Sequence, residues 1–278
     1  MAKPKKQNSL TAVSGTLVLV GAGKMGGAML EGWLARKLPP NKVVVLEPQP
    51  SRSLKALARR GVRINPRGDI GKVAALVIAV KPQSAPEALP LLAALTDETS
   101  VVVSIMAGRT LGFIEKHLPN TAIVRAMPNT PAAIGRGITV AVGNRRVTAK
   151  ARTLAHSLLA ATGSVEWVDD EALMDAVTAV SGSGPAYVFL LAEAMARAGS
   201  AAGLPVALAE RLARETVAGS GELLHRSAEP AATLRQNVTS PGGTTAAALD
   251  VLMSDGGMAP LMTKAIAAAT RRGKELAG

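Results

Sequence analysis

The stretch Thr16-Leu17-Val18-Leu19-Val20-Gly21-Ala22-Gly23-Lys24-Met25-Gly26 contains the pattern that decides the fold. Residues 16–20 are apolar and rich in β-branched side chains, which is typical of a buried strand. Three glycines follow at once with the spacing Gly-x-Gly-x-x-Gly, and residues 27–37 continue as an expected helix that ends before Pro39-Pro40. A strand, a glycine-rich loop and a helix in this order predict a dinucleotide-binding loop that consists of Gly21, Ala22, Gly23, Lys24, Met25 and Gly26.

Each glycine has its own physical role in such a loop. Gly21 permits a tight turn, Gly23 lets the backbone approach a pyrophosphate, and Gly26 lets the helix pack close to the strand. The helix then presents free N–H groups and a partial positive charge to the phosphates. The alternative is a glycine-rich turn that binds nothing.

The alternation of strands and helices continues to about residue 168. Further strands are expected at residues 43–46, 75–80, 101–103, 121–125 and 138–142. A second helix is expected at residues 51–60, with Gly61 at its end. This alternation predicts parallel βαβ units and therefore a parallel sheet.

The pattern changes near Asp169, beyond which the sequence has no convincing strand. Alanine-rich helices are expected at residues 171–180, 185–199, 205–225, 230–236, 244–253 and 258–276. We therefore predict an α/β fold, with an N-terminal Rossmann-type parallel sheet in residues 15–168 and a C-terminal all-α domain in residues 169–278. Residues 1–14 are expected to form a disordered basic leader.

Composition excludes several classes of function. The chain has 278 residues, no cysteine and three widely spaced histidines, so we expect neither a disulfide nor a metal site. The formal net charge is +12, but the basic residues are scattered and aromatic residues make up only 2%, so no nucleic-acid platform is expected. No apolar run is long enough to span a membrane, and the leader has no apolar segment typical of a secretory signal. A cytoplasmic location is expected.

The end of the second predicted strand bears on the type of dinucleotide. Glu47 lies there, 21 positions after Gly26, where an acid accepts hydrogen bonds from the adenosine ribose and repels a 2′-phosphate. Ser51 and Arg52 follow closely, and they have the chemistry to hold a 2′-phosphate or, alternatively, to cap a helix and face solvent. The sequence therefore leaves NADH and NADPH both open.

Three further segments are expected at the carboxyl ends of strands, where ligands bind in open parallel sheets. Ala79, Val80, Lys81 and Pro82 bring a cation and a fixed bend to one strand end. Small residues surround Met106 and Ala107 at the next, where a flat nicotinamide ring would fit. Asn129 lies between two prolines in a third, rigid polar loop. Each alone is also compatible with an ordinary turn.

Two glycine-rich segments stand out in the helical half. Residues 181–187 lead into a long helix with Pro185 in its first turn, which indicates mainly a junction between helices. Residues 237–245 form the densest run of small polar residues and precede the expected helix 244–253. N–H groups and hydroxyls at a helix start suit a carboxylate, although a capped helix start is the alternative.

The motifs occur in a specific order. They are Gly-x-Gly-x-x-Gly, Ala-Val-Lys-Pro-Gln, Ser-Ile-x-Ala-Gly, Arg-x-Met-Pro-Asn-Thr-Pro-Ala, Ser-Gly-Ser-Gly-Pro-Ala-Tyr and Thr-Ser-Pro-Gly-Gly-Thr-Thr. In this order they make the chain resemble the pyrroline-5-carboxylate reductase family over residues 16–275. The resemblance implies NAD(P)H-dependent reduction of the cyclic imine 1-pyrroline-5-carboxylate to L-proline, the last step of proline biosynthesis. It also implies homodimers that interlock through the helical domain and assemble into larger rings.

The resemblance also implies roles for individual residues. The loop at Gly21 and the strand end at Lys81 would bind the cofactor, and Met106 and Ala107 would border its nicotinamide. Thr245 would contact the substrate nitrogen, and Glu171 is the acid nearest to the substrate ring. The substrate carboxylate and ring would be held by Asn237, Val238, Ser240, Pro241, Gly242, Gly243, Thr244 and Thr245. Met106 stands where the family has a small residue, so we expect it to narrow the cleft.

Two other classes of protein fit the sequence less well. A β-hydroxyacid dehydrogenase needs a catalytic lysine early in its second domain, but residues 171–225 contain no lysine. A non-catalytic dinucleotide-binding scaffold would not need the polar segment that ends at Thr245. An imine reductase of wider substrate range remains an alternative. Since threonine is a poor acid and no His, Lys or Cys lies beside Thr245, we expect Thr245 to donate or relay a hydrogen bond to an imine already protonated by water.

Overall fold

The computed structural model describes residues 10–11 and 13–277. Their packing forms two compact units: one contains the described residues up to 182 together with residues 270–277, and the other contains residues 183–269. The sheet ends at Trp167, close to the predicted boundary at residue 168, whereas the change in packing comes later, after Gly182. The functional division of the chain at residue 168 stays a prediction.

The start of the chain differs from the prediction in part. Residues 1–9 and 12 of the expected leader lie outside the described residues. Leu10 and Val13, however, are buried in the core of the first unit, and the Leu10 N–H donates to the carbonyl oxygen of Arg36. The packed structure therefore begins before residue 15, because these two apolar side chains belong to the same hydrophobic core as Leu17 and Trp33.

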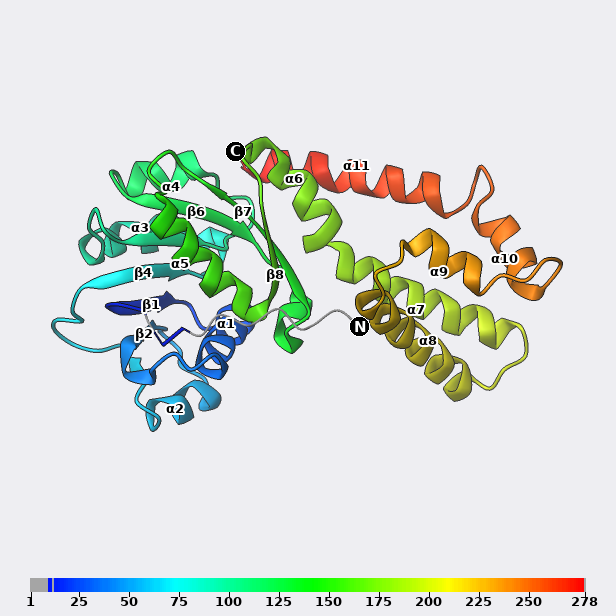
Figure 1. Cartoon of the computed structure of the whole chain (residues 1–278), viewed down its shortest axis with the longest axis horizontal. Coiled ribbons are helices and arrows are strands. Elements are labelled where there is room, and N and C mark those ends of the chain that lie inside the picture. Colours follow the sequence, from blue (N-terminus) through cyan, green and yellow to red (C-terminus); the bar gives the residue numbers. More distant parts are fainter. Residues whose placement is uncertain (1–9, 12, 278) are drawn as a thin grey trace. The chain divides into compact units, whose positions relative to one another are not determined.

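Over the described residues, eight strands form one sheet in the order β3-β2-β1-β4-β5-β6-β7-β8 (Figure 1). The strands are β1 Thr16–Val20, β2 Val43–Leu46, β3 Arg63–Ile64, β4 Val73–Ile78, β5 Val101–Ser104, β6 Ala122–Met127, β7 Gly137–Gly143 and β8 Gly163–Trp167. The pairing is parallel throughout except between β6 and β7. The predicted Rossmann-type sheet is confirmed.

The prediction of the sheet was wrong in two details. The strands β3 and β8 were not expected, and both lie at the edges of the sheet. The connection from β6 to β7 covers residues 128–136, which is too short for the crossover helix that parallel strands need, so β7 runs antiparallel to β6.

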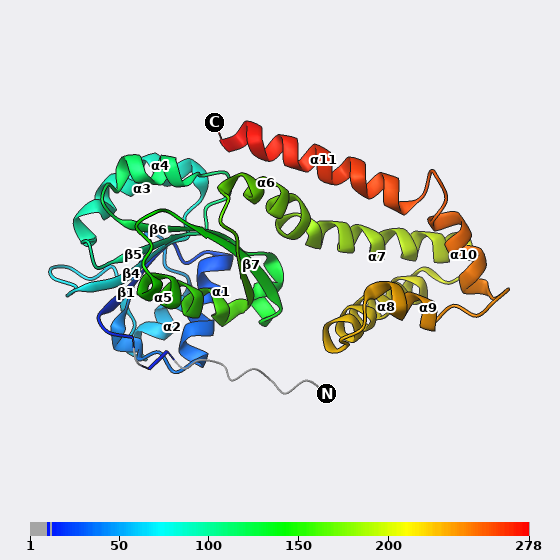
Figure 2. The same ribbon diagram turned by 45° about the horizontal axis from the view of Figure 1, so that its top comes forward.

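Helices cover both faces of the sheet (Figure 2). Alternate side chains of β1 point to opposite faces: Leu17 and Leu19 pack with α1 Lys24–Ala35 and α5 Ala149–Leu159, whereas Val18 and Val20 belong to the core under the other helices. Those other helices are α3 Ala85–Leu92 and α4 Leu111–His117, and the short α2 Arg52–Ala58 packs on the first face through Leu54. The sheet is therefore buried on both sides, as a parallel sheet requires.

The C-terminal part is helical, as predicted. Its helices are α6 Met174–Val177, α7 Gly184–Ala201, α8 Val206–Arg226, α9 Ala231–Asn237, α10 Thr244–Leu252 and α11 Met258–Ala277. The expected single helix over residues 171–180 is instead a 3₁₀ turn at Glu171–Leu173, the short α6 and a π-helical turn at Thr178–Gly182. Pro185 lies in the first turn of α7, as expected.

The unit of residues 183–269 has almost no core of its own. Within it, only Ala209 and Ala213 are buried, and both are small. Large apolar side chains are exposed instead, and on α7 they are Val188, Phe189, Leu190, Leu191 and Met195. Helices that bury so little apolar surface need a partner surface to be stable.

Neither a membrane span nor a metal cluster occurs in the part of the chain that the structure describes. None of its helices is both long enough and apolar enough to cross a bilayer. None of its His, Asp and Glu side chains gather in a group of three or more that would hold a metal ion.

Candidate functional site

The candidate cofactor loops all leave the sheet from one row of residues. Leu46, Val20, Ile78 and Ser104 lie side by side as the last residues of β2, β1, β4 and β5, and Arg125, two residues before the end of β6, lies beside Ser104. Successive strands are added on one side of β1 up to β3 and on its other side from β4 onward. The point between β1 and β4, where the strand order reverses, is where α/β sheets open a crevice for a ligand. The structure therefore brings the predicted cofactor segments to a single edge.

The glycine loop has the geometry that a bound pyrophosphate requires. Gly21 has a φ of +87°, and a Cβ there would lie 2.8 Å from the carbonyl oxygen of Ala79. A Cβ at Gly26 would overlap the carbonyl oxygen of Gly21, whereas one at Gly23 would meet none of the described atoms within 4 Å. Gly21 and Gly26 thus hold the turn closed, and Gly23 leaves its outer side open for a phosphate to approach.

The first turn of α1 is free to receive an anion. Gly23 is the N-cap residue, and no described side chain caps this helix. The side chain of Lys24 is exposed at the same turn and adds a positive charge. Because uncapped N–H groups at a helix start bind phosphates, the loop fits a dinucleotide.

Glu47 lies beside this loop and contacts it directly. Its Oε2 accepts a hydrogen bond of 2.8 Å from the Ala22 N–H, and its Oε1 accepts one of 3.0 Å from the Gln49 N–H. Ser51, the alternative phosphate ligand, is the N-cap of α2: its Oγ accepts from the Leu54 N–H and bonds to Ser53 Oγ. Arg52 is exposed in the first turn of α2.

The loops after β4 and β5 are linked by a residue that the sequence analysis missed. Arg109 donates two hydrogen bonds to the carbonyl oxygen of Pro82, at 3.1 Å from Nε and 2.9 Å from Nη2. Its guanidinium also lies 4.5 Å from the ring centroid of Phe113. Arg109 therefore fixes the bend after Lys81. The sequence feature that could have indicated this role is a basic residue directly after Ala107-Gly108, at the expected end of a strand.

The side chain of Met106 does not have the predicted role. It is 2% exposed and packs in the core beneath α3 and α4. The expectation that it narrows the nicotinamide side of the cleft was wrong, because the chain turns this side chain inward after β5. Ala107, the next residue, is exposed at the strand end.

Asn129 lies at the same edge, but part of its side chain is engaged. Its Oδ1 accepts a hydrogen bond of 2.9 Å from the Ile138 N–H, which ties the loop after β6 to the start of β7. A role for Asn129 in cofactor binding stays a prediction.

Glu171 forms a specific ion pair. Its Oε1 lies 2.8 Å from Nη1 of Arg125 and also accepts a hydrogen bond from the Leu111 N–H at the start of α4. The Arg125 side chain is 6% exposed and that of Glu171 is 28% exposed. This carboxylate therefore joins β6, α4 and the turn before α6, and a catalytic role for it stays a prediction.

The predicted substrate segment lies in the helical unit and leads into α10. Gly243 is the N-cap residue, and none of the described side chains caps the helix. Gly242 has a φ of +68°, and a Cβ at Gly243 would lie 2.5 Å from Ser240 Oγ. The Gly243 N–H donates to the Ser240 carbonyl oxygen, and Thr245 is half-buried in the first turn. The backbone is thus folded tightly around an uncapped helix start.

The other members of this segment are less constrained. Val238 is 66% exposed, and the Asn237 amide donates to a carboxylate oxygen of Glu229 at 3.3 Å. Pro241 and Thr244 are exposed. The segment therefore presents an open polar surface for a small anion.

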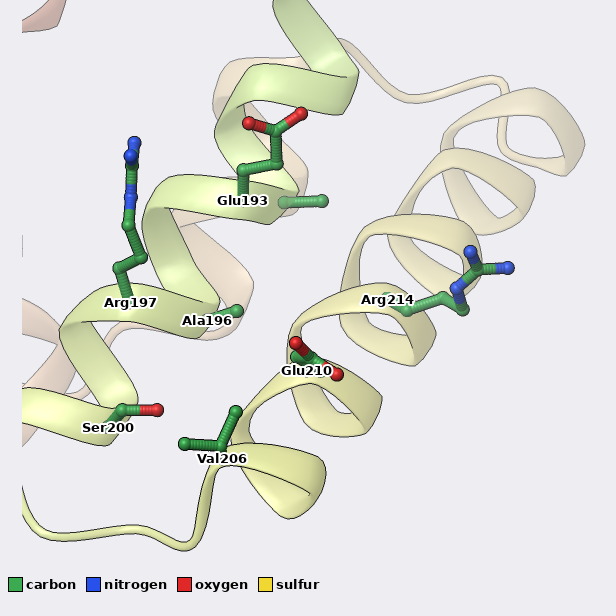
Figure 3. Close-up of a pocket in the computed structure, with 8 residues that line it drawn as sticks. Glu193, Ala196, Arg197, Ser200, Val206, Glu210 and Arg214 are labelled. Atoms are coloured by element: carbon green, nitrogen blue, oxygen red, sulfur yellow. The ribbon is translucent and has the colours of Figure 1, made fainter.

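A groove of about 620 Å³ lies between α7 and α8 in the helical unit (Figure 3). Glu193, Arg197, Glu210 and Arg214 line it together with small side chains such as Ala196. None of the predicted site residues lines it. Large apolar side chains of α7 are exposed around this groove. Exposed apolar surface of this kind is typical of contact with another chain, so we do not interpret the groove as a catalytic site.

Comparison with known proteins shows which family this chain belongs to. Residues 171–276 match the family model for pyrroline-5-carboxylate reductase dimerisation, and residues 16–108 match that for NADP oxidoreductase, coenzyme F420-dependent. The pyrroline-5-carboxylate reductase of Synechocystis sp. is 42% identical over 94% of this chain and 97% of its own length. The chain belongs to the pyrroline-5-carboxylate reductase family. The enzyme of the same name from Thermus thermophilus is 40% identical over 94% of this chain and 98% of its own length.

Solved structures of family members have the same fold. A pyrroline-5-carboxylate reductase from Coxiella burnetii matches with a TM-score of 0.86 at 35% identity, over 94% of this chain and 98% of its own. The Plasmodium falciparum pyrroline carboxylate reductase, solved with NADP bound, matches with a TM-score of 0.78 at 27% identity, over 95% and 98%. The family, the fold and the dimerisation domain predicted from the sequence are confirmed.

Proposed function

We propose that this chain catalyses the reduction of 1-pyrroline-5-carboxylate to L-proline with NADH or NADPH, the last step of proline biosynthesis. The observation that carries the proposal is the closed glycine loop at Gly21–Gly26 in a member of the pyrroline-5-carboxylate reductase family. The tight contacts at Gly21 and Gly26 and the open side of Gly23 are the features that a dinucleotide needs.

The residues at the sheet edge would hold the dinucleotide. The N–H groups at the start of α1 would bind the pyrophosphate, with Lys24 adding charge. The exposed Ala107 and the bend held by Arg109 would border the nicotinamide, and Lys81 stands exposed at the neighbouring strand end. When bound, the reduced nicotinamide supplies the hydride that the imine carbon accepts.

The start of α10 would hold the substrate carboxylate. Its uncapped N–H groups and the positive end of the helix favour a negative charge, and the turn at Gly242 and Gly243 keeps this position accessible. Fixing the carboxylate orients the five-membered ring, and orientation of two reactants can lower a barrier by several kcal/mol, at most about 7–11.

Thr245 would act at the ring nitrogen. The Thr245 hydroxyl is a weak acid, so water would protonate the imine, and the hydroxyl oxygen would then accept a hydrogen bond from the iminium N–H. The nitrogen becomes a neutral amine when the imine carbon gains hydride, and a hydroxyl in the same helix turn accommodates both states because it can donate or accept. The family resemblance also implies that Glu171 lies near the ring. Because its carboxylate is paired with Arg125 and accepts from the Leu111 N–H, we assign Glu171 to holding the turn before α6 rather than to catalysis.

The assembly would be a homodimer that forms larger rings, in the cytoplasm. The nearly coreless helical unit supports a partner copy, because its exposed apolar side chains gain stability only when another surface covers them. The number of subunits is measured by light scattering after size-exclusion chromatography.

Steady-state assays test the proposed reaction. Purified protein is given pyrroline-5-carboxylate with NADH and, separately, with NADPH, and proline formation is measured. Turnover with either cofactor supports the proposal. Tight cofactor binding without turnover with either would support a dinucleotide-binding scaffold instead. Faster turnover of cyclic imines that lack the carboxylate would favour an imine reductase of wider range.

A further inference from the structure

We infer that Glu47 makes this chain select NADH over NADPH. The inference rests on the proposed function, whose cofactor it specifies. The Glu47 carboxylate is built into the glycine loop, because each of its oxygens already accepts one backbone hydrogen bond, from Ala22 and from Gln49. The carboxylate is therefore fixed at the position where the adenosine ribose lies in sheets of this topology.

The backbone of Glu47 is held as firmly as its side chain. Its N–H donates to Asn65 Oδ1 at 2.9 Å, and its carbonyl oxygen accepts from Asn65 Nδ2 at 2.8 Å. Asn65 itself has a φ of +43°, a conformation that asparagine tolerates better than most residues, and its N–H donates to the Val45 carbonyl oxygen. Asn65 is thus a positioning residue, because its side-chain amide bonds to both the N–H and the carbonyl oxygen of Glu47 at the end of β2.

This arrangement suits two ribose hydroxyls. A carboxylate has about four acceptor positions, and the two hydrogen bonds from Ala22 and Gln49 use two of them. The remaining positions can accept from a 2′- and a 3′-hydroxyl without moving the side chain. Because the Glu47 side chain is already held in place before the cofactor binds, little of the binding free energy is lost in ordering this side chain.

The same arrangement opposes a 2′-phosphate. The phosphate would bring a second anion against a carboxylate that cannot swing away without breaking its bonds to the loop. The two residues with the chemistry to bind a phosphate, Ser51 and Arg52, lie at the start of α2. Ser51 Oγ is used in capping α2, and Arg52 is an exposed side chain in the first turn of α2. The balance at this strand end therefore favours the unphosphorylated cofactor.

Equilibrium binding tests the inference without relying on turnover. The Kd values of NADH and NADPH are measured from nicotinamide fluorescence for the wild-type protein and for Glu47→Gln, which keeps the shape and removes the charge. Because the Glu47 carboxylate would repel a 2′-phosphate bound at the ribose position, we expect the wild-type protein to bind NADH at least about tenfold more tightly than NADPH. Glu47→Gln should bind NADPH about tenfold more tightly than wild type and reduce the preference to a few fold. Asn65→Gly retains the left-handed backbone but removes the two hydrogen bonds from the Asn65 side chain to the Glu47 backbone. This variant should partly reduce the preference for NADH over NADPH.

Lys55→Gln is the matched control, because it removes one charge from the exposed side of α2. It should leave the preference unchanged within about twofold, since water and salt largely screen the charge of an exposed side chain. The inference is overturned if wild type prefers NADPH, or if Glu47→Gln leaves the preference unchanged. It is also overturned if Arg52→Ala, rather than Glu47→Gln, controls the affinity for NADPH. Failure of the proposed function appears separately, as absence of proline formation with both cofactors.

Discussion

Gly26 lies so close to the carbonyl oxygen of Gly21 that a Cβ at residue 26 would overlap that oxygen. The same Cβ would lie 3.1 Å from the Cβ of Ala79 at the end of β4. The helix that follows the loop therefore packs directly on two strand ends. This contact sets the position of the N–H groups that we assign to the cofactor pyrophosphate.

Replacement of Gly26 by alanine should consequently damage the loop. The carbonyl oxygen of Gly21 belongs to the backbone and cannot rotate away, so we expect a loss of stability of about 1–3 kcal/mol. The Kd of NADH should rise by about tenfold or more, because the N–H groups move away from the phosphates. Urea denaturation and a nicotinamide fluorescence titration measure the two effects.

Gly27→Ala is the control for this experiment. A Cβ at Gly27 would lie 3.7 Å from the Ala22 carbonyl oxygen, which is ordinary van der Waals contact. Since alanine favours a helix interior over glycine, Gly27→Ala should stabilise the protein by about 0.5–1 kcal/mol and leave the Kd of NADH unchanged. Equal affinities for the Gly26 and Gly27 variants would show that the close packing does not matter for binding.

The second prediction concerns Thr245. Replacement by alanine removes the hydroxyl that we place at the substrate nitrogen, so kcat/KM for pyrroline-5-carboxylate should fall by about tenfold or more, or about 1.4 kcal/mol. The Kd of the cofactor should not change. Thr263→Ala is the matched control, because Thr263 Oγ1 donates to the Ala259 carbonyl oxygen on an exposed part of α11. A Thr245→Ala enzyme with the activity of the Thr263→Ala enzyme would remove Thr245 from the mechanism.

The ion pair between Arg125 and Glu171 leads to the third prediction. Glu171→Gln leaves the buried guanidinium of Arg125 without its counter-charge, so stability should fall by about 1–3 kcal/mol, less than for a fully buried pair because Glu171 is partly exposed. Well below the unfolding temperature, kcat should stay within about twofold of wild type.

Glu222→Gln provides the comparison for Glu171. Glu222 pairs with Arg226 on the surface of α8, where such a pair contributes about 0.5 kcal/mol or less. Stability is measured by chemical denaturation at one fixed protein concentration, since association also contributes. If Glu171→Gln lowers kcat tenfold at unchanged stability, Glu171 acts in catalysis and not in holding the turn before α6.

The strands that were predicted well have a common physical reason. The bounds of β1 and β2 agree with the prediction, because a parallel strand buried on both faces needs an uninterrupted apolar run. Such a run is visible in a single sequence. The edge strand β8 alternates between exposed and half-buried residues and contains Gly163 and Glu166, so its pairing with β7 depends on tertiary structure.

The candidate site was predictable only in its position along the chain. Parallel topology alone places Gly21, Glu47 and Lys81 at one edge, since the carboxyl ends of the parallel strands meet there. Side-chain conformation was not predictable in the same way. The bond from Ala22 to Glu47, the inward turn of Met106 and the contact of Arg109 with Pro82 all depend on the path of loops, which no periodicity in the sequence describes.

The fourth prediction concerns the support of the glycine loop by α5. Nε1 of Trp33 on α1 donates a hydrogen bond of 2.9 Å to the carbonyl oxygen of Leu158 on α5, and the Trp33 side chain is fully buried. Trp33→Phe removes this bond and leaves unfilled space in the core between the two helices. We expect a loss of stability of about 1–3 kcal/mol, the sum of a buried hydrogen bond and a small cavity.

Trp167→Phe is the matched substitution, because Trp167 is the other tryptophan of the chain and is only half-buried. Its Nε1 donates a longer hydrogen bond of 3.3 Å to His156 Nδ1, so its replacement should cost about 0.5–1 kcal/mol. Both variants lose a tryptophan, so unfolding is followed by far-UV circular dichroism rather than by fluorescence. A loss at Trp33 no larger than that at Trp167 would mean that α5 does not hold α1, and with it the glycine loop, in place.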